Sequence, residues 1–268
     1  MPEPFSIPGT TAVVTGAAGG IGLALARRLL REGAARVVVT DRDADRIAAA
    51  AEALGERAHA MAFDVADENA VADAVARIER DHGPIDLWCS NAGVAAGRGL
   101  GDDADWDLSW RVHVMAHVYV ARALFPRMAR RGSGHLLVTA SAAGLLTQLD
   151  SAPYSATKHG AVALAEWLAI RHADEGISVS CLCPQGVNTA MTAGDGGASA
   201  TRLGGDYIEP DDVAESVVAA LHTGRFLVLP HPEAAGFEQR RAADRDRWLD
   251  GMRRAWAKIR AGAAGRAD

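Results

Sequence analysis

Cysteine is scarce in this sequence, with three in 268 residues, at positions 89, 181 and 183. A small, odd number excludes the disulfide framework of small secreted domains and predicts a reducing, cytoplasmic location. Cys181 and Cys183 have the spacing of half a metal site, but no second pair of Cys or His lies near them in the sequence. We therefore expect small thiols in a buried strand, and no metal.

Aromatic residues are also few, at 5% of a chain that is 49% hydrophobic, so Ala, Val and Leu must form the core. No apolar run approaches the roughly 20 residues of a membrane span. The N-terminus, MPEPFSIPG, lacks the basic and apolar regions of a signal peptide. A strong excess of one charge is absent too, because the net charge is -6. This balance argues against nucleic acid or an anionic membrane as the main partner.

Strand-like apolar runs alternate with helical patterns along the whole chain. Several runs are continuous in Val and Leu, which predicts a parallel sheet with helices on both faces. No linker or repeat interrupts the rhythm, so we expect one domain over residues 1–268. The predicted strands are 11–16, 36–41, 57–65, 86–93, 135–141, 177–184 and 225–230, and the predicted helices are 20–32, 43–54, 67–81, 104–130, 153–173 and one starting near 209.

Two segments depart from this rhythm. Residues 190–209 are rich in Gly, Ala and Ser with little periodicity, which predicts a functional loop or lid. A helical extension with an apolar stripe is expected at about 231–262. Three roles stay open for that extension: packing on its own domain, covering a neighbouring active site, or enlarging a subunit interface.

A glycine cluster, TGAAGGIG, follows the first predicted strand and opens a helix. Glycine permits a tight turn and a close approach to a pyrophosphate, whose charge favours a helix N-terminus. A plain turn is the alternative for a lone glycine cluster. The context, in the first βα unit, favours a nucleotide site. The candidate residues are Gly16, Gly20, Ile21 and Gly22.

The end of the second predicted strand carries Asp41 and Arg42. A carboxylate there can bind both adenosine ribose hydroxyls and repels a 2′-phosphate, whereas a guanidinium binds phosphate. We expect NAD rather than NADP, with Asp41 as a simple turn or capping residue as the alternative. Two further strand ends suit a dinucleotide, although both could be turns only: Asp64 with Val65, and Asn91 with Ala92 and Gly93.

Ser141 follows the fifth strand, and Tyr154 and Lys158 lie four residues apart on the next predicted helix. Residues at that spacing share a helix face. A nearby ammonium stabilises phenolate and so lowers the pKa of a Tyr, which lets it exchange a proton while hydride moves. We expect that effect on Tyr154, with Ser141 holding the substrate oxygen. Taken alone, such a helical pair is usually structural.

The sequence resembles the short-chain dehydrogenase/reductase family. The resemblance rests on TGAAGGIG, Asp41, NAG at 91–93, Ser141 and YSATK at 154–158, in order and spacing over about residues 8–230. It implies a single-domain Rossmann-type doubly wound sheet of seven strands. It also implies Tyr154 as general acid/base, Lys158 on the nicotinamide ribose, and Ser141 on the substrate oxygen. A homodimer or homotetramer packed through helices 104–130 and 153–173 is implied too.

The strand-six exit is similar to the family's Pro-Gly motif, with one departure. Pro184, Val187 and Thr189 match positions that meet the nicotinamide carboxamide and the phosphates in the family. Gln185 stands where the family usually has Gly. It could therefore border the substrate pocket or be structurally neutral.

His113 is the second departure. The register from Trp106 through Val112 places it where the family usually has an Asn that holds a water linked to Lys158. Without the resemblance, His113 would be interpreted as a core histidine. With it, we expect an imidazole that holds the relay water, because one ring nitrogen accepts and the other donates.

The substrate pocket is expected to include Leu146, Gln148 and Gln185 among mostly small, apolar residues. This predicts an oxidoreductase that interconverts a small to medium hydrophobic secondary alcohol and its ketone. Two alternatives stay open on the same fold: a non-redox enzyme, such as an epimerase or dehydratase, and an inactive cofactor-binding sensor.

Overall fold

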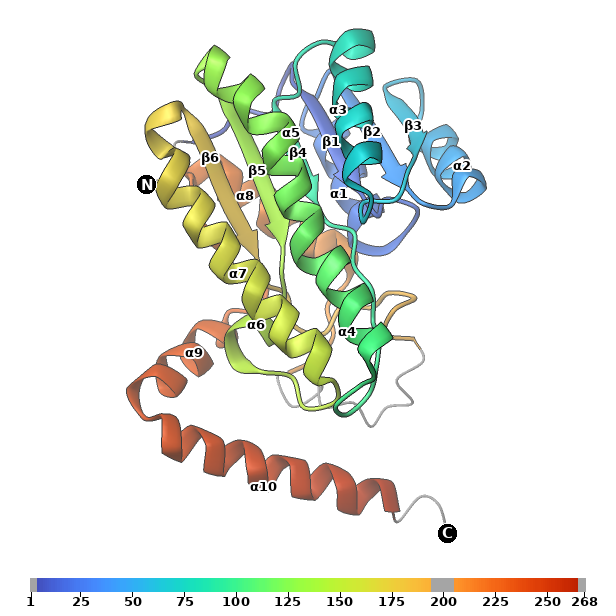
Figure 1. Cartoon of the computed structure of the whole chain (residues 1–268). Helices are drawn as coiled ribbons and strands as arrows, with labels where there is room; N and C mark the ends of the chain where they lie inside the picture. The colour runs from blue at the N-terminus through green and yellow to red at the C-terminus, as the bar shows by residue number, and fades with distance from the viewer. Residues whose placement is uncertain (1–3, 194–204, 265–268) are drawn as a thin grey trace.

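The computed structural model describes residues 4–193 and 205–264, excluding the side chains of 262–264. Seven parallel strands form one sheet in the order β3-β2-β1-β4-β5-β6-β7 (Figure 1). The predicted doubly wound seven-stranded sheet is therefore confirmed. The strands are β1 (Thr11–Thr15), β2 (Arg36–Asp41), β3 (Ala58–Ala62), β4 (Leu87–Ser90), β5 (Gly134–Thr139), β6 (Ile177–Leu182) and β7 (Leu227–Val228).

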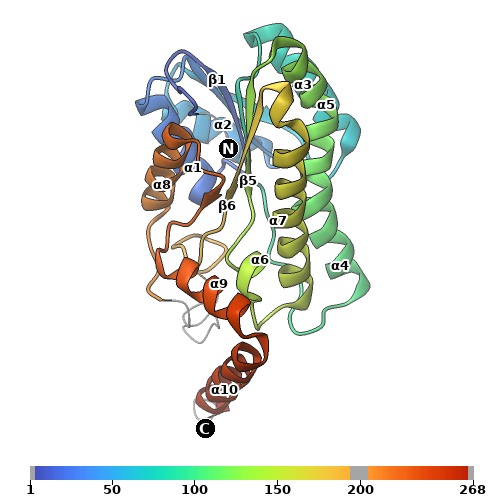
Figure 2. The ribbon, with the colours of Figure 1, turned by 90° about the vertical axis from the view of Figure 1, so that its left-hand side faces the viewer.

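Helices cover both faces of the sheet (Figure 2). On one face α1 (Gly20–Arg31), α2 (Ala44–Leu54) and α8 (Pro210–Thr223) share an apolar cluster with the strands. The opposite face packs against α3 (Glu68–His82), α5 (Ala116–Arg131) and α7 (Ala152–His172). The remaining helices are α4 (Asp103–Trp110), the π-helical turn η1 (Arg111–Met115), α6 (Ala143–Leu146), the 3-10 turn η2 (Ala173–Glu175), α9 (Glu233–Ala243) and α10 (Arg245–Ala264).

Small aliphatic residues form the core, as the composition predicts. Trp88 is a large exception, fully buried in β4. Cys89, Cys181 and Cys183 are free thiols, also buried. Within the described residues no group of His, Cys, Asp and Glu is suited to hold a metal ion, and no helix has the length and apolarity needed to cross a bilayer.

The strand order reverses between β1 and β4, which places a crevice at their carboxyl ends. The hydroxyl of Thr15, the last residue of β1, accepts hydrogen bonds from the backbone N–H groups of Asn91 at 2.9 Å and Ala92 at 3.0 Å. The Asn91 amide donates to the Thr15 carbonyl at 3.0 Å and accepts from the Thr139 hydroxyl at 3.2 Å. The ends of β1, β4 and β5 are thus joined where the site forms.

Several predicted elements differ in detail. Strands β3, β4 and β7 are shorter than predicted. The helix predicted over 104–130 contains the π-turn η1, which periodicity did not reveal. The extension expected at 231–262 breaks at Asp244, whose extended backbone ends α9. The lid predicted over 190–209 falls partly outside the described residues, at 194–204.

Candidate active site

The glycine loop after β1 leaves no room for side chains at two positions. A Cβ on Gly16, whose φ is +65°, would lie 2.9 Å from the Cα of Ala92. A Cβ on Gly22 would lie 2.3 Å from the Gly16 carbonyl oxygen. Both contacts are far inside van der Waals range, so glycine is required at both. The loop between β1 and α1 therefore packs directly against the end of β4.

The N-terminus of α1 is free of side-chain caps. Gly19 precedes it without a capping hydrogen bond, and the first turn holds no acidic residue. Asp43 and Asp67, in contrast, cap the starts of α2 and α3. Uncapped N–H groups at a helix N-terminus attract phosphate. Together with the glycine loop, this end of α1 fits a dinucleotide pyrophosphate.

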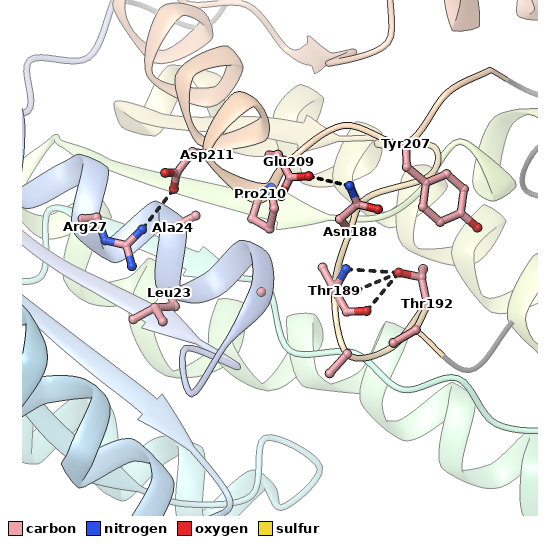
Figure 3. A pocket seen from close by; sticks show the side chains of 13 residues that line it. Leu23, Ala24, Arg27, Asn188, Thr189, Thr192, Tyr207, Glu209, Pro210 and Asp211 are labelled. Atoms are coloured by element: carbon pink, nitrogen blue, oxygen red, sulfur yellow. Dashed lines mark hydrogen bonds and ion pairs between the residues drawn. The ribbon is translucent and has the colours of Figure 1, made fainter. Parts of the chain in front are cut away.

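A cavity of about 810 Å³ opens beside this end of α1 (Figure 3). The α1 residues Gly20, Leu23 and Arg27 form one wall, and Thr189 and Asp211 lie on the other. Arg27 and Asp211 form an ion pair of 3.2 Å across its edge. None of its described lining residues is Ser141, Tyr154 or Lys158, so the cavity belongs to the phosphate end of the site.

Asp41, Arg42 and Arg46 lie between the end of β2 and the first turn of α2. A carboxylate oxygen of Asp41 accepts the Asp43 N–H at 3.3 Å, which orients it. Arg42 is exposed beside it. Arg46 of α2, which the sequence analysis did not single out, extends to within 3.5 Å of the Ala18 carbonyl in the glycine loop.

Two other predicted cofactor residues, Asp64 and Asn91, form hydrogen bonds within the protein scaffold, whereas Gly93 lies at the catalytic site. The Asp64 carboxylate accepts the Ala66 N–H at 2.8 Å and forms a turn after β3, beside the half-buried Val65. Both polar atoms of the Asn91 side chain join strands, as described above. Gly93 lies next to the catalytic candidates, since a Cβ there would be 3.8 Å from His113 Nε2 and 3.9 Å from Lys158 Nζ.

Ser141, Tyr154 and Lys158 converge at the carboxyl edge of the sheet. The Ser141 hydroxyl lies beside the Tyr154 phenol and accepts the Ala143 N–H at 3.1 Å. The Lys158 ammonium lies 5.7 Å from the centre of the Tyr154 ring and donates to the Thr139 carbonyl at 3.0 Å. The Ser151 side chain accepts the Tyr154 N–H at 3.2 Å and so caps α7. The α7 start thereby sets the orientation of the Tyr.

The pKa of Tyr154 is raised, opposite to the predicted direction. Burial is the largest cause and outweighs the hydrogen bond with Ser141, which lowers the pKa. Burial also lowers the pKa of Lys158 to about 8, so its charge is only partly maintained at slightly alkaline pH. The predicted lowering of the Tyr154 pKa was wrong for the protein alone, because the effect of burial outweighs the effects that lower the pKa.

His113 is fully buried and lies edge-on to the Tyr154 ring, with ring centres 5.4 Å apart. Its Nδ1 lies 2.9 Å from the Thr157 hydroxyl, whose one hydrogen goes to the Pro153 carbonyl at 2.7 Å. With that hydroxyl hydrogen on Pro153, Nδ1 donates to Thr157 and Nε2 accepts the Val94 N–H at 3.1 Å; in the other tautomer Nε2 donates to the Val94 carbonyl at 3.0 Å. Burial lowers the His113 pKa to about 2, with Lys158 as the next cause, so the ring is neutral.

Protein groups thus engage both ring nitrogens of His113. The π-turn η1 supplies the inward position, since Val112, His113 and Val114 are all buried in succession. Such turns often occur at functional sites. The predicted water relay through His113 stays a prediction. The observed contacts describe a brace between the Val94 backbone and α7.

His231, missed in the sequence analysis, holds the exit of β6. The ring is buried, its Nδ1 accepts the Gln185 N–H at 3.2 Å, and its Nε2 donates to the Gly186 carbonyl at 3.1 Å. The Gln185 side-chain amide donates to Glu233 at 3.3 Å. Beyond it, Val187 is buried and forms a bridge with Ile208, while the Pro184 carbonyl accepts the Ala142 N–H at 2.9 Å. No local pattern around His231 signals this clamp.

The predicted substrate residues divide into two kinds. The Gln148 side-chain carbonyl accepts the N–H groups of Asp150 at 3.0 Å and Ser151 at 2.8 Å, so it stabilises a turn. Leu146 is half-buried at the end of α6, a helix that packs against α7. With Gln185 held by Glu233, neither glutamine has its full hydrogen-bonding capacity left for a ligand.

A protein-family model described as short chain dehydrogenase matches residues 10–198. The chain belongs to the short-chain dehydrogenase family. Membership of this family indicates an NAD(P)-dependent oxidoreductase and does not identify the substrate.

Two curated relatives are enzymes. Gluconate 5-dehydrogenase of Gluconobacter oxydans is 39% identical over 196 residues, covering 71% of this chain and 76% of the relative. 1-Deoxy-11-beta-hydroxypentalenate dehydrogenase of Streptomyces exfoliatus is 39% identical over 236 residues, covering 83% of each chain.

Two solved structures share the fold and hold different cofactors. A short-chain dehydrogenase/reductase from Burkholderia phymatum in complex with NAD has a TM-score of 0.81 at 28% identity, covering 90% of this chain and 96% of that chain. L-Sorbose reductase from Gluconobacter frateurii, complexed with NADPH and L-sorbose, has a TM-score of 0.74 at 27% identity, covering 85% and 97%.

Proposed function

We propose that this short-chain dehydrogenase interconverts a secondary alcohol and its ketone, with Tyr154 as the general acid/base. The observation that carries the proposal is the convergence of Ser141 and Tyr154 beside Lys158, whose ammonium lies 5.7 Å from the centre of the Tyr154 ring and whose side chain is buried. Lys158 is 3% exposed, and an ammonium is costly to bury unless it is used.

A bound nicotinamide supplies or accepts the hydride. On the protein side, Ser141 orients the substrate oxygen, and Tyr154 donates a proton to that oxygen in reduction or takes one in oxidation. Lys158, fixed by the Thr139 carbonyl, provides positive charge next to the phenol. Because burial raises the Tyr154 pKa, the phenol is protonated at neutral pH and ready to donate.

We assign His113 to positioning rather than to proton transfer. It fixes the ring of Tyr154 by edge-on contact and holds the Val94 backbone next to the substrate side of the site. An Asn is shorter than an imidazole and would not span both partners. This brace is compatible with the relay water expected from the family resemblance, provided that another group holds the water.

NAD is our proposed cofactor, with NADP as the alternative. The oriented Asp41 carboxylate favours ribose hydroxyls, while Arg42 and Arg46 lie near enough to meet a 2′-phosphate once that carboxylate is removed. We expect Asp41→Ser to raise kcat/KM with NADP at least tenfold and to lower it with NAD. Asp45→Ser, on an exposed turn of α2, is the matched control. A preference that stays unchanged in Asp41→Ser would contradict this assignment.

The substrate is proposed to be a hydrophobic ketone or alcohol of small to medium size. Ala142, Ala143 and Leu145, which follow Ser141, are apolar and buried, and Gln148 and Gln185 form hydrogen bonds with protein groups. Few polar groups are then free to recognise hydroxyl-rich substrates. The relatives are named for gluconate, L-sorbose and a hydroxypentalenate, and these compounds differ too widely to indicate one substrate class for this chain.

Two further properties complete the proposal. A homodimer or homotetramer is supported by Trp167 and Ile170 on the outer face of α7, which are 57% and 82% exposed. Sedimentation at micromolar concentration tests it, and Ile170→Glu should lower the association constant. A cytoplasmic location is supported by the three free thiols.

The deciding experiment is a panel of ketones and secondary alcohols, run with NAD(H) and NADP(H) and followed at the nicotinamide absorbance. We expect one reduced nicotinamide per ketone formed from a hydrophobic alcohol. Substrate conversion without net nicotinamide change would favour an epimerase or dehydratase. Tight cofactor binding without conversion of any compound would favour a sensor.

A further inference from the structure

The last helix, α10, extends away from the body of the domain. Both views place it beyond the end of the molecule where α4, α6 and α9 lie, attached through α9 (Figures 1 and 2). Its joint with α9 is fixed at Asp244, whose carboxylate accepts the Arg247 N–H at 3.0 Å. Trp248 contacts Phe237 of α9 with ring centres 6.4 Å apart. This corner holds α10 off its own domain.

An apolar stripe runs along α10. Leu249 and Trp256 are 56% and 37% exposed, and Met252 and Ile259 are partly exposed. Their spacing of three, four and seven residues places them on one side of the helix. A helix of this kind is stable in water chiefly when its apolar side is covered. The stripe therefore requires a partner surface.

The charge of α10 restricts what that partner is. The helix carries six basic and two acidic residues, a net charge of +4, so the rest of the chain carries -10. Among the described residues Arg254, Lys258 and Arg260 form no ion pair. Pairing of two α10 helices would bring like charges together. An acidic, partly apolar surface is the complementary one.

The same chain presents such a surface at the start of α4. We call residues 100–108 the α4 corner. Leu100 and Leu108 are 77% and 41% exposed there. Asp103 and Asp107 are exposed, and neither pairs with a basic group within the described part of the chain. The corner thus has exposed leucines next to unpaired carboxylates, matching the composition of α10 with opposite charge.

We propose that α10 docks on the α4 corner of a second copy of this chain. Its apolar stripe covers Leu100 and Leu108, and its basic side chains face Asp103 and Asp107. An anionic membrane is the main competitor for a basic amphipathic helix. The charge of -10 on the remaining chain opposes the approach of the domain to such a surface, whereas it favours contact with α10 of another copy.

Docking of α10 would also hold in place the segment at the exit of β6, which borders the active site. Glu233 begins α9 and accepts the Gln185 amide, and His231 just before it clamps the exit of β6. A partner that holds α10 therefore anchors, through α9, the segment that closes this edge of the site. The docking itself is independent of the proposed reaction, so its test needs no turnover.

Cross-linking between two distinguishable chains tests the contact directly. The three native cysteines are buried, so single cysteines can be added at Asp107→Cys in a tagged chain and Ala255→Cys in an untagged chain. With a short bismaleimide we expect a covalent pair of one tagged and one untagged chain. Glu52→Cys on α2, paired with Ala255→Cys, is the control and should give none.

Charge reversal identifies the partner surface. Lys258→Glu with Arg260→Glu in the α10 chain should lower the cross-linking yield at least fivefold, and Asp103→Arg in the α4 chain should restore it. A cross-linking yield that is the same with and without the charge reversals on α10 and the α4 corner would overturn the proposal. Absence of the mixed pair also overturns the proposal. A cross-link within one chain that carries both cysteines would then place α10 on its own α4 corner. Sedimentation of wild-type protein with anionic, but not zwitterionic, phospholipid vesicles would instead identify a membrane as the partner.

Discussion

At the scale of single residues, the site depends on how burial changes acid–base behaviour. Tyr154 and Lys158 could be identified from the sequence because their spacing is specific and because Ser141 and the glycine cluster accompany them in the expected order. The direction of the Tyr154 pKa could not be identified, since desolvation depends on what surrounds the ring in three dimensions. His231 and Thr15 were missed for the same reason: each acts through backbone groups distant in sequence.

Tyr154→Phe removes the proton donor while keeping the ring that contacts His113. We expect kcat to fall by about 10²–10⁴-fold, the usual contribution of general acid–base catalysis, with little change in cofactor affinity. Steady-state rates and cofactor titration measure both. Tyr119→Phe, on α5, is the control and should retain full activity. A Tyr154→Phe enzyme with near-normal kcat would remove the phenol from the mechanism.

His113→Ala leaves the Val94 N–H without its acceptor and the Tyr154 ring without its edge contact. We expect kcat to fall at least tenfold, with cofactor affinity less affected. The kcat of His113→Asn should lie between the kcat of His113→Ala and that of the wild type, because an amide can replace only one of the two hydrogen bonds of the imidazole. Kinetics over pH 6 to 9 measure this pair of variants. Unchanged turnover and pH dependence in both would show that the imidazole has no role in the site.

At the scale of elements, long periodic helices and buried strands were predicted well. The helix pattern over 104–130 did not reveal the π-turn, because a single extra residue per turn barely disturbs apolar spacing. The break at Asp244 was hidden because the apolar stripe continues through it. The predicted length of β7 was too great because residues that flank its two observed positions are also apolar.

The exit of β6 depends on the neutral form of His231, since its Nδ1 must be unprotonated to accept the Gln185 N–H. Burial lowers the His231 pKa, so the clamp is intact at neutral pH and is lost only as pH falls below the ordinary range of a His. We expect His231→Ala to raise the cofactor Kd about tenfold at pH 7.5. His222→Ala, on the exposed end of α8, should leave it unchanged. Equal Kd values for the two variants would mean that the clamp does not shape the cofactor site.

At the scale of the whole molecule, buried neutral histidines make stability depend on pH. Burial lowers the pKa of His113, His117 and His135 to about 2, 3 and 4. The unfolded chain binds protons at these residues below about pH 6.5, and the folded chain does not. Their contribution is therefore complete above that pH and is lost as pH falls, by up to about 1.4 kcal/mol per pH unit for each His.

Urea unfolding at pH 7.5, 6.5, 5.5 and 4.5 measures this dependence. We expect a small decrease in the midpoint between pH 7.5 and 6.5 and a steep fall below pH 6.5. His135→Leu should give a shallower fall, because one of the three buried imidazoles is gone and its place in the core is apolar. A midpoint that stays constant down to pH 4.5 would contradict the neutral, buried state of these residues.

The central claim is hydride transfer at a carbinol carbon with Tyr154 handling the proton. The most direct measurement uses a secondary alcohol from the panel, deuterated at that carbon, with NAD. The account predicts one deuterium in each reduced nicotinamide formed and loss of this transfer in Tyr154→Phe. Deuterium that is retained in the product or washed into solvent without reduced nicotinamide would contradict it.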